Sequence, residues 1–271
     1  MPELPEVETT KRGIEPHVIK KKINSIYIGK HNLRIKFNKN QKNNILNTKI
    51  AGVRRKAKYI LVDFTNKHSL LIHLGMTGNL RVSDTLSLGK HDHIAFSLSS
   101  KKHLIFNDVR RFGLILIIKE GEKINLLENN GPDPFEKDAN YKYFYKKIEK
   151  SKSTIKSILL NSKIISGIGN IYASEILFAS KISPLKIGSS ITQSECKTIL
   201  KNSKKILKKA INAGGTTLND YLNADASPGY FKIHLNVYDR ESKDCRKCAQ
   251  KIKRIVQNGR STFFCSKCQL K

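Results

Sequence analysis

The spacing of the cysteines near the C-terminus is the feature that most constrains the fold. Four of the five cysteines follow the pattern C-x2-C-x16-C-x2-C, as Cys245, Cys248, Cys265 and Cys268. Two close pairs separated by about the length of a hairpin are typical of a tetrahedral four-thiolate zinc site. Disulfide bonds between these cysteines are the alternative, but they are rare in cytoplasmic proteins because thiols are kept reduced there. We predict one structural zinc ion in a unit, residues 236–271, that is too small to build a core alone.

The charge of the chain indicates a polyanionic partner. Lys and Arg number 51 against 22 Asp and Glu, a formal net charge of +29 that is spread along all 271 residues. A nucleic-acid backbone is the first candidate and an anionic membrane surface the second. The sequence has no apolar stretch of about 18 residues and no N-terminal signal pattern. We therefore expect a soluble cytoplasmic protein, and not a membrane protein.

The hydrophobic pattern changes along the chain and predicts an α+β multidomain protein. After an opening helix, residues 33–37, 59–64, 69–75 and 93–98 alternate apolar and polar side chains, which favours an antiparallel β-sandwich over residues 1–130. Residues 131–152 contain two prolines, a glycine and acids, and are interpreted as a linker. Helical periodicity then predicts a helical domain over 153–235, before the zinc unit at 236–271.

One helix of the second domain is defined sharply by its sequence. Residues 192–195, "TQSE", form a predicted capping box, and Gly214–Gly215 closes the helix. Its apolar stripe includes Cys196, which we interpret as a core residue and not as a ligand. The many lysines on its other faces are either a solvated surface or a DNA contact, and the sequence leaves both open.

The first residues of the chain combine a proline with two carboxylates. Pro5 and Glu6 suit the first turn of a helix, which is the simplest interpretation. Removal of the initiator methionine would also expose Pro2 as a secondary amine. An α-amino group titrates near pH 8, so it has a larger uncharged, nucleophilic fraction at neutral pH than lysine has. Such an amine forms Schiff bases, and Glu3 is placed to move protons beside it.

Motifs in order along the whole chain resemble those of formamidopyrimidine-DNA glycosylase, a family that excises oxidised purines. They are "PELPEVET", "RRKAKYI", "HLGMTGNLR", "KHDH", "DVRRFG", "IKSILLNSKIISGIGNIYASEILF", "AGGTTLNDY", "SPGYF" and "GRSTFFCSKCQ". The resemblance implies a β-sandwich domain, a helical domain with a helix–two-turns–helix element, and a zinc finger. It also implies a double-stranded DNA partner containing oxidised bases, and we expect a monomer.

The resemblance assigns four catalytic residues. Pro2 would be the nucleophile at the sugar C1′, and Glu3 the proton donor that helps to expel the base and open the ring. Lys58 would donate a proton during β-elimination, and Arg260, near the tip of the finger hairpin, would serve δ-elimination. The product would be a one-nucleotide gap with phosphate at both ends. Glu6 would support the site by hydrogen bonding.

The resemblance also implies how the duplex is held open. A damaged base must leave the stack before it can be reached, and the void that it leaves must be filled. The family fills it with residues that correspond to Met76, Arg110 and Phe112, and Arg110 would read the orphaned base. From the residues alone, Met76 and Phe112 would instead be interpreted as core.

Further DNA contacts follow from the same resemblance. His91 and Asn170 would contact DNA, and glycines in "GIGN" and "AGGTT" would let the backbone approach phosphates. Ser151 falls on a DNA-contacting position of the family, where the neighbouring Lys152 could supply the charge. The "SPGYF" segment would close over the flipped base. Ala249 stands where the family commonly has glycine, which predicts some strain in the metal knuckle.

Two other functions are compatible with parts of the sequence. A sister enzyme of the same superfamily removes oxidised pyrimidines, but it usually opens with glycine in place of Leu4. A catalytically silent nucleic-acid-binding protein is the alternative from another class, and the presence of every proposed catalytic residue argues against it.

Overall fold

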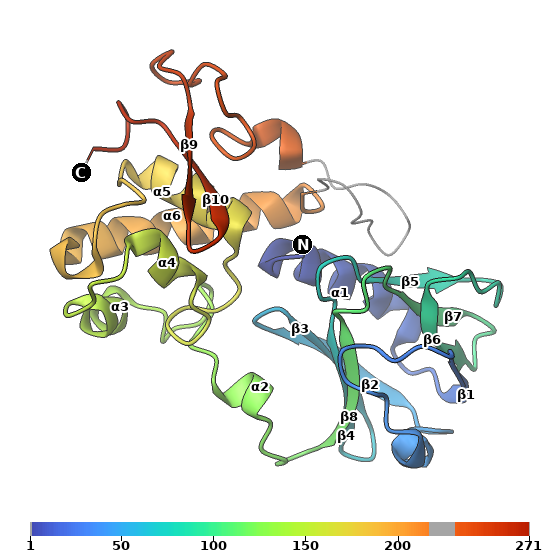
Figure 1. Cartoon of the computed structure of the whole chain (residues 1–271). Helices are drawn as coiled ribbons and strands as arrows, with labels where there is room; N and C mark the ends of the chain where they lie inside the picture. Colours follow the sequence, from blue (N-terminus) through green and yellow to red (C-terminus); the bar gives the residue numbers. More distant parts are fainter. Residues whose placement is uncertain (1, 217–230, 271) are drawn as a thin grey trace. The chain divides into compact units, whose positions relative to one another are not determined.

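The computed structural model describes residues 2–216 and 231–270, and the chain forms two compact units (Figure 1). The first unit contains the residues up to Ile124 and the described residues from Ile211 onward, as far as residue 216. The second contains Asn125–Ala210 and the described residues from Phe231. Within the part of the chain that is described, no helix is both long and apolar enough to cross a membrane.

Two antiparallel four-stranded sheets and an N-terminal α-helix are the main elements of the first unit. Helix α1 (Leu4–Val18) begins as its sequence predicts, with proline in its first turn and Glu6 near its positive end. The first sheet has the order β1 (Ile23–Ile28), β6 (Asp92–Leu98), β7 (His103–Asn107) and β5 (Asn79–Ser83). The second has the order β2 (Ile50–Lys56), β3 (Tyr59–Phe64), β4 (His68–His73) and β8 (Leu114–Lys119). Apolar residues of both sheets and of α1 form one core, which confirms the predicted β-sandwich.

One predicted strand is wrong. Residues 33–37 form no strand and lie in the segment between β1 and the short 3-10 helix η1 (Lys39–Asn44). Leu33 and Phe37 are nevertheless buried and join the sandwich core. Ile35, the middle apolar residue of the segment, is 38% exposed, so the alternation predicted burial only in part. A strand also needs a neighbouring strand to hydrogen-bond, and β1 pairs with β6 instead.

Helices dominate the second unit. They are α2 (Asn125–Glu128), α3 (Tyr141–Ile148), α4 (Ile155–Leu160), α5 (Asn170–Ser180), α6 (Gln193–Asn212), and the 3-10 turns η2 (Gly188–Ser190) and η3 (Phe231–His234). Helix α5 is buried on nearly every side, so it is the central helix of the unit. The capping box that begins α6 is confirmed, because Thr192 and Glu195 exchange backbone-to-side-chain hydrogen bonds of 2.8 and 3.2 Å. Cys196 is fully buried, as predicted.

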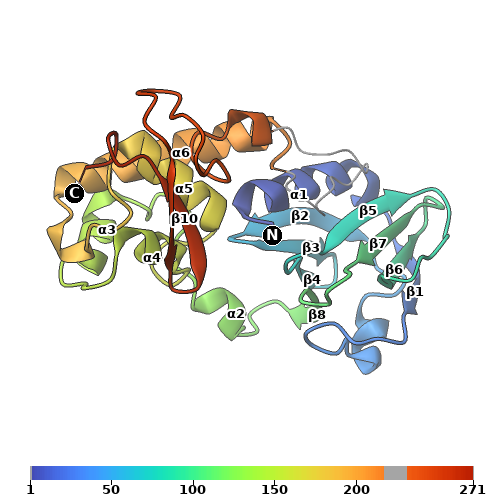
Figure 2. The ribbon, with the colours of Figure 1, turned by 45° about the horizontal axis from the view of Figure 1, so that its top comes forward.

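The C-terminal segment forms a hairpin of β9 (Lys253–Gln257) and β10 (Arg260–Phe264), and β10 lies beside α5 (Figure 2). Its two-residue turn has positive φ at both Asn258 and Gly259, as a tight hairpin requires. The finger shares a core with Phe178 of α5, so it does not pack alone.

The predicted domain bounds stay predictions. The segment predicted as a linker, residues 131–152, contains helix α3.

Candidate active site

The two carboxylates of the N-terminus are buried and connected. Pro2 is buried, and Glu3 and Glu6 are each 1% exposed. Glu6 accepts the backbone N–H of Glu3 at 2.8 Å with one oxygen and that of Thr216 at 2.8 Å with the other. Glu6 therefore holds both the first residues of the chain and the segment that follows α6. The hydrogen bonding expected of Glu6 is present, and its support of catalysis stays a prediction.

Gly215 lets that segment approach the carboxylate closely. It has φ +80°, and a Cβ at this position would lie 3.1 Å from Glu6 Oε1. A larger residue would push the chain away from the acid and strain the backbone. Gly215 of "AGGTT" thus serves a contact with Glu6 in this structure, and the predicted approach of these glycines to phosphates stays a prediction.

Lys58 lies half-buried at the turn between β2 and β3. The turn is tight, since Ala57 has φ +53°. Arg55 fastens it to the N-terminal helix, because its guanidinium donates to Glu8 at 2.9 Å and to the carbonyl of Ala57 at 2.9 Å. The lysine is therefore carried by a turn that is tied to α1, the helix that Pro2 and Glu3 precede.

His73, at the end of β4, is a neighbour of Lys58 that sequence reasoning missed. Burial, together with the positive charges of Arg34 and Lys58, lowers the pKa of His73 to about 4, so the ring is neutral at physiological pH. Its Nδ1 accepts the N–H of Gly75 at 3.0 Å, which leaves the proton on Nε2. A neutral donor beside a lysine could bind an anion without adding charge. The sequence signal that could have identified His73 is its position as the first residue of the motif "HLGMTGNLR".

Two loops bring Met76, Arg110 and Phe112 into one region of the first unit. Asp108 is fully buried and organises both loops. Its carboxylate accepts the Thr77 hydroxyl at 2.6 Å and the N–H of Gly113 at 2.7 Å. Gly75 packs so tightly that a Cβ there would lie 2.5 Å from the backbone of Phe112 and Gly113.

The three side chains that these loops carry are exposed. Met76 is 38% and Phe112 44% exposed, so the interpretation of these residues as core is wrong. The Arg110 guanidinium carbon lies 4.8 Å from the centre of the Phe112 ring. A solvent-exposed apolar side chain next to an arginine is suited to insertion between stacked bases.

In the second unit, two side chains converge on the carbonyl of Ser261, next to Arg260. Lys156 is fully buried, and its Nζ donates to Ser261 O at 2.8 Å and to the hydroxyl of Thr262 at 2.7 Å. Asn170, the first residue of α5, donates its side-chain amide to the same carbonyl at 2.9 Å. Arg260 itself is exposed at the hairpin tip, opposite Gln257 in the ladder. Lys156 was missed by sequence reasoning, although a lysine in the apolar stretch "TIKSILL" was a signal.

A buried carboxylate connects the finger to α5. Glu175 is 2% exposed and accepts backbone N–H groups of Asn236, Val237 and Tyr238 at 2.8 to 3.0 Å. The chain that enters the finger is therefore fixed to the same helix whose N-terminal residue is Asn170. Sequence reasoning missed Glu175, because it has no short-range motif.

The four predicted metal ligands meet in space. The sulfur atoms of the four cysteines all lie within 4.8 Å of one another. Cys245 and Cys268 are 3.9 Å apart, and Cys248 and Cys265 are 3.5 Å apart. A tetrahedral site with Zn–S bonds of about 2.3 Å has sulfur–sulfur edges of about 3.8 Å, so the cluster fits one zinc ion. Ala249 has φ +60°, the conformation in which the family's usual glycine would be unstrained.

The remaining predicted contacts are placed as follows. His91 is half-buried before β6, and its carbonyl accepts the N–H of Asp108 at 3.0 Å. Ser151 is half-buried and accepts the N–H of Ser153, whereas Lys152 is exposed. The predicted base-capping segment "SPGYF" lies outside the described residues except for its last position, Phe231.

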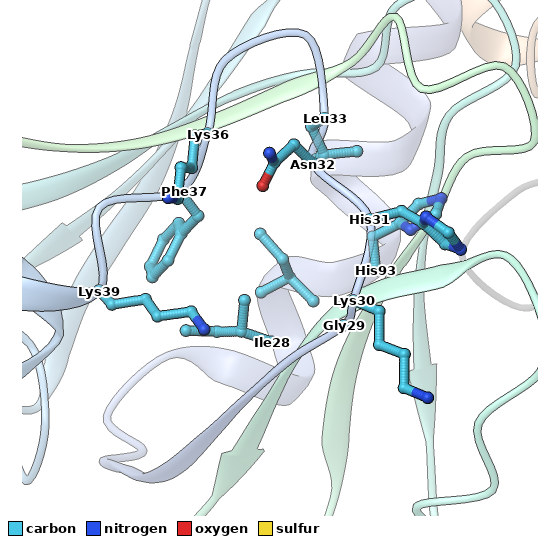
Figure 3. Close-up of a pocket in the computed structure, with 11 residues that line it drawn as sticks. Ile28, Gly29, Lys30, His31, Asn32, Leu33, Lys36, Phe37, Lys39 and His93 are labelled. Atoms are coloured by element: carbon cyan, nitrogen blue, oxygen red, sulfur yellow. The ribbon is translucent and has the colours of Figure 1, made fainter.

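A separate polar pocket of about 370 Å³ lies in the first unit, between the end of β1 and η1 (Figure 3). Asn32, Phe37 and Lys39 face its hollow, and Lys30 points away from it (Figure 3). Among its described lining residues, none is a predicted catalytic or DNA-binding residue. The pocket is therefore not part of the N-terminal cluster.

Three family models cover most of the chain in the order of its regions. The formamidopyrimidine-DNA glycosylase N-terminal domain matches residues 1–115, and the H2TH domain of the same enzyme matches residues 130–221. A zinc finger found in this enzyme and in isoleucyl-tRNA synthetase matches residues 242–270. The sandwich, the helical unit and the four-cysteine finger thus define a DNA glycosylase of the class that combines these three regions.

Curated relatives and solved structures agree along the whole chain. The formamidopyrimidine-DNA glycosylase of Rickettsia felis is 43% identical over 99% of this chain and 98% of its own length. The crystal structure of the MutM (Fpg) protein of Thermus thermophilus has a TM-score of 0.89 at 33% identity, with 99% of this chain and 98% of that chain covered. A Lactococcus lactis Fpg in complex with abasic-site DNA has a TM-score of 0.89 at 33% identity, over 99% of this chain and all of its own. The chain belongs to the formamidopyrimidine-DNA glycosylase family, whose members are DNA glycosylases with abasic-site lyase activity.

Proposed function

We propose that this enzyme removes oxidised purines, such as 8-oxoguanine and formamidopyrimidines, from double-stranded DNA with Pro2 as the nucleophile. The burial of Pro2 and Glu3 before α1, with Glu6 holding the backbone of Glu3, is the observation that carries the proposal. Once Met1 is removed, the proline nitrogen is a secondary amine that is partly neutral at pH 7. The enzyme is proposed to act as a monomer in the cytoplasm.

The proposed chemistry uses the residues of both units. The Pro2 nitrogen bonds to C1′ while the glycosidic bond breaks and the base leaves with a proton. Glu3 donates a proton to the ring oxygen, and the opened sugar forms an iminium ion with the proline nitrogen. Lys58 then assists β-elimination, and Arg260 assists δ-elimination of the remaining sugar. Hydrolysis of the iminium frees the proline.

Duplex opening is assigned to the exposed side chains of the two loops. Phe112 and Met76 are proposed to fill the space that the damaged base leaves, and Arg110 to hydrogen-bond the base opposite. Extrusion of a base costs a few kcal/mol, which such wedges help to offset. The exposure of both apolar side chains supports this role.

Relatives of known structure support the choice of substrate. A Lactococcus lactis enzyme that is 34% identical to this chain is solved with a formamidopyrimidine-containing DNA. A MutM protein with a TM-score of 0.90 and 34% identity is solved with DNA that contains carbocyclic 8-oxoguanine. The resemblance extends over the full length of this chain in both.

Borohydride trapping on a duplex with 8-oxoguanine opposite cytosine tests the proposal. The expected result is a covalent protein–DNA adduct whose cross-linked peptide contains Pro2. A matched protein with a short N-terminal extension, which blocks the amine, should bind the duplex but form no adduct and no strand break. An adduct mapped to Lys58, or full cleavage by the extended protein, would contradict the proposal.

The same assay distinguishes purine from pyrimidine specificity. A duplex with thymine glycol serves as the second substrate, at the same enzyme concentration and salt. Faster single-turnover excision of 8-oxoguanine is expected. Preferred excision of thymine glycol would assign the chain to the activity of the sister enzyme instead.

A further inference from the structure

The outer face of helix α6 carries an unusual concentration of positive charge. The helix spans Gln193–Asn212, and its lysines on this face are all exposed: Lys197, Lys201, Lys204, Lys205, Lys208 and Lys209. At 100° per residue they fall within a sector of about 140°, opposite the buried stripe that contains Cys196 and Leu207. We call these six residues the α6 lysine face.

Among the residues that the structure describes, no acidic side chain pairs with this face. Glu195 is the single acid of the helix, and it accepts hydrogen bonds from Lys186 at 2.7 Å and from the N–H of Thr192 at 2.8 Å. Within the part of the chain that the structure describes, none of the six lysines forms an ion pair. Four of the lysine pairs are spaced i,i+4, where like charges repel and weaken a helix. A bound polyanion would remove that repulsion.

An aromatic ring extends the face at its N-terminal end. Lys197 Nζ lies 4.4 Å from the ring centre of Tyr141, the first residue of α3. Figures 1 and 2 show α3 beside the beginning of α6. Basic side chains next to an aromatic ring are typical of surfaces that contact nucleic acids.

The α6 lysine face is separate from Asn170, the predicted DNA contact at the beginning of α5. Asn170 and Lys156 converge on Ser261, and Asn170 begins α5. Helix α6 contacts α5 at its other end, where Asn202 donates to the hydroxyl of Ser180 at 3.0 Å. The lysines point away from the stripe that makes the packing contacts of α6. They are therefore available to a ligand other than the DNA at Asn170.

We propose that the α6 lysine face is a second nucleic-acid site, which binds the sugar–phosphate backbone of another duplex segment. From Lys197 to Lys209 the helix rises about 18 Å, which matches about five phosphates along one strand. Such binding is electrostatic and independent of base sequence. With this second site, the enzyme would move from one duplex segment to another while it stays bound to at least one of them. The proposal rests on DNA binding by this family and not on the chemistry of Pro2.

A two-duplex binding experiment tests the site. The full-length protein is first saturated with a short unlabelled duplex that contains a tetrahydrofuran abasic analogue. A longer, undamaged, fluorescent duplex is then titrated in, and its anisotropy is measured over a range of salt concentrations. Capture of the second duplex is expected, with affinity that falls steeply as salt rises.

Matched charge variants identify the surface responsible. In the test variant, Lys201→Gln, Lys205→Gln and Lys208→Gln are combined, since glutamine keeps the helix propensity of lysine. The control removes the same charge from exposed lysines of the first unit, with Lys42→Gln, Lys119→Gln and Lys123→Gln. The test variant should bind the second duplex roughly tenfold more weakly, with a salt slope shallower by roughly 2 to 3. The control should change little.

Three results would overturn the proposal. The first is that the saturated protein does not bind the second duplex. The second is that both triple variants lose the same affinity for it. The third is that the protein binds anionic phosphatidylglycerol vesicles and not the second duplex. Borohydride trapping on a short 8-oxoguanine duplex should be the same in all three proteins. Because the second-duplex measurement needs no turnover, failure of the trapping assay would count against the proposed function alone.

Discussion

The Glu6 carboxylate and the backbone N–H of Thr216 lie 2.8 Å apart, although 210 positions of the chain separate them. The other oxygen of the same carboxylate holds the N–H of Glu3. One buried acid thus fixes the start of the chain to the segment that follows α6. The position of Glu3 depends on a contact that only the folded chain provides.

Substitution Glu6→Gln should destabilise the first unit and slow base excision. An amide has one acceptor oxygen and would turn an NH2 group toward one of the two backbone donors. Loss of a buried hydrogen bond to a charged group costs about 1.5 to 3 kcal/mol. Chemical unfolding and single-turnover excision are the measurements. As a control, Glu15→Gln on the same helix removes a partly exposed pair with Lys11 and should cost less than about 1 kcal/mol. Equal costs would contradict the assigned role of Glu6.

Substitution Lys156→Met should weaken the lyase step more than it weakens DNA binding. The buried ammonium donates to Ser261 and Thr262, next to Arg260, and its loss leaves those acceptors without this partner. The expected loss of stability is about 1 to 3 kcal/mol. Cleavage of an abasic duplex and thermal unfolding check the effect, with the exposed Lys163→Met as the control. Unchanged cleavage would show that Arg260 needs no support from Lys156.

Zinc removal should unfold the finger and abolish tight DNA binding. The finger has a small core that it shares with Phe178, so the metal supplies much of its folding free energy. Elemental analysis should give one zinc per chain, and none after Cys248→Ser combined with chelation. Duplex affinity is measured in parallel, with Cys196→Ser, outside the cluster, as the variant that keeps its zinc. Metal-free protein with full affinity would refute the prediction.

The neutral His73 should make stability depend on pH below neutrality. Its folded-state pKa is about 4, lowered by burial and by the charges of Arg34 and Lys58, against about 6.5 when unfolded. The unfolded chain therefore binds the proton first, so the contribution of this group is complete above pH 6.5 and is lost as pH falls toward 4. Urea unfolding at pH 7 and pH 4.5 should show about 2 to 3 kcal/mol more loss in the wild type than in His73→Asn. Parallel losses in the two proteins would contradict the shift.

Substitution Phe112→Ala should reduce excision from duplex DNA while leaving the protein folded. The side chain is 44% exposed, so its removal should change the free energy of unfolding by less than about 0.5 kcal/mol. The wedge that keeps the stack open would be missing, so excision at saturating enzyme should fall. Val109→Ala, which alters an exposed apolar residue of the same loop, is the control. A rate loss of the same size in both variants would assign the effect to the loop as a whole.

The sequence alone predicted those features that lie within a few residues of one another. The paired cysteines, the capping box at Thr192 and the proline with its two acids are short patterns, because each depends on local spacing or on one turn of a helix. The motifs that resemble the family are likewise contiguous. These patterns sufficed for the order of the regions and for a zinc finger with a four-cysteine cluster, and both are confirmed.

Tertiary structure decided the rest, since long-range contacts leave no local pattern. The strand predicted at 33–37 lacks a neighbouring strand. Phe112 is apolar but exposed, in a loop that Asp108 holds through the N–H of Gly113. His73, Lys156 and Glu175 gained their roles from partners that the fold brings to them. A charged or titratable side chain acquires its chemistry from burial and from nearby charges, and both are properties of the packed chain.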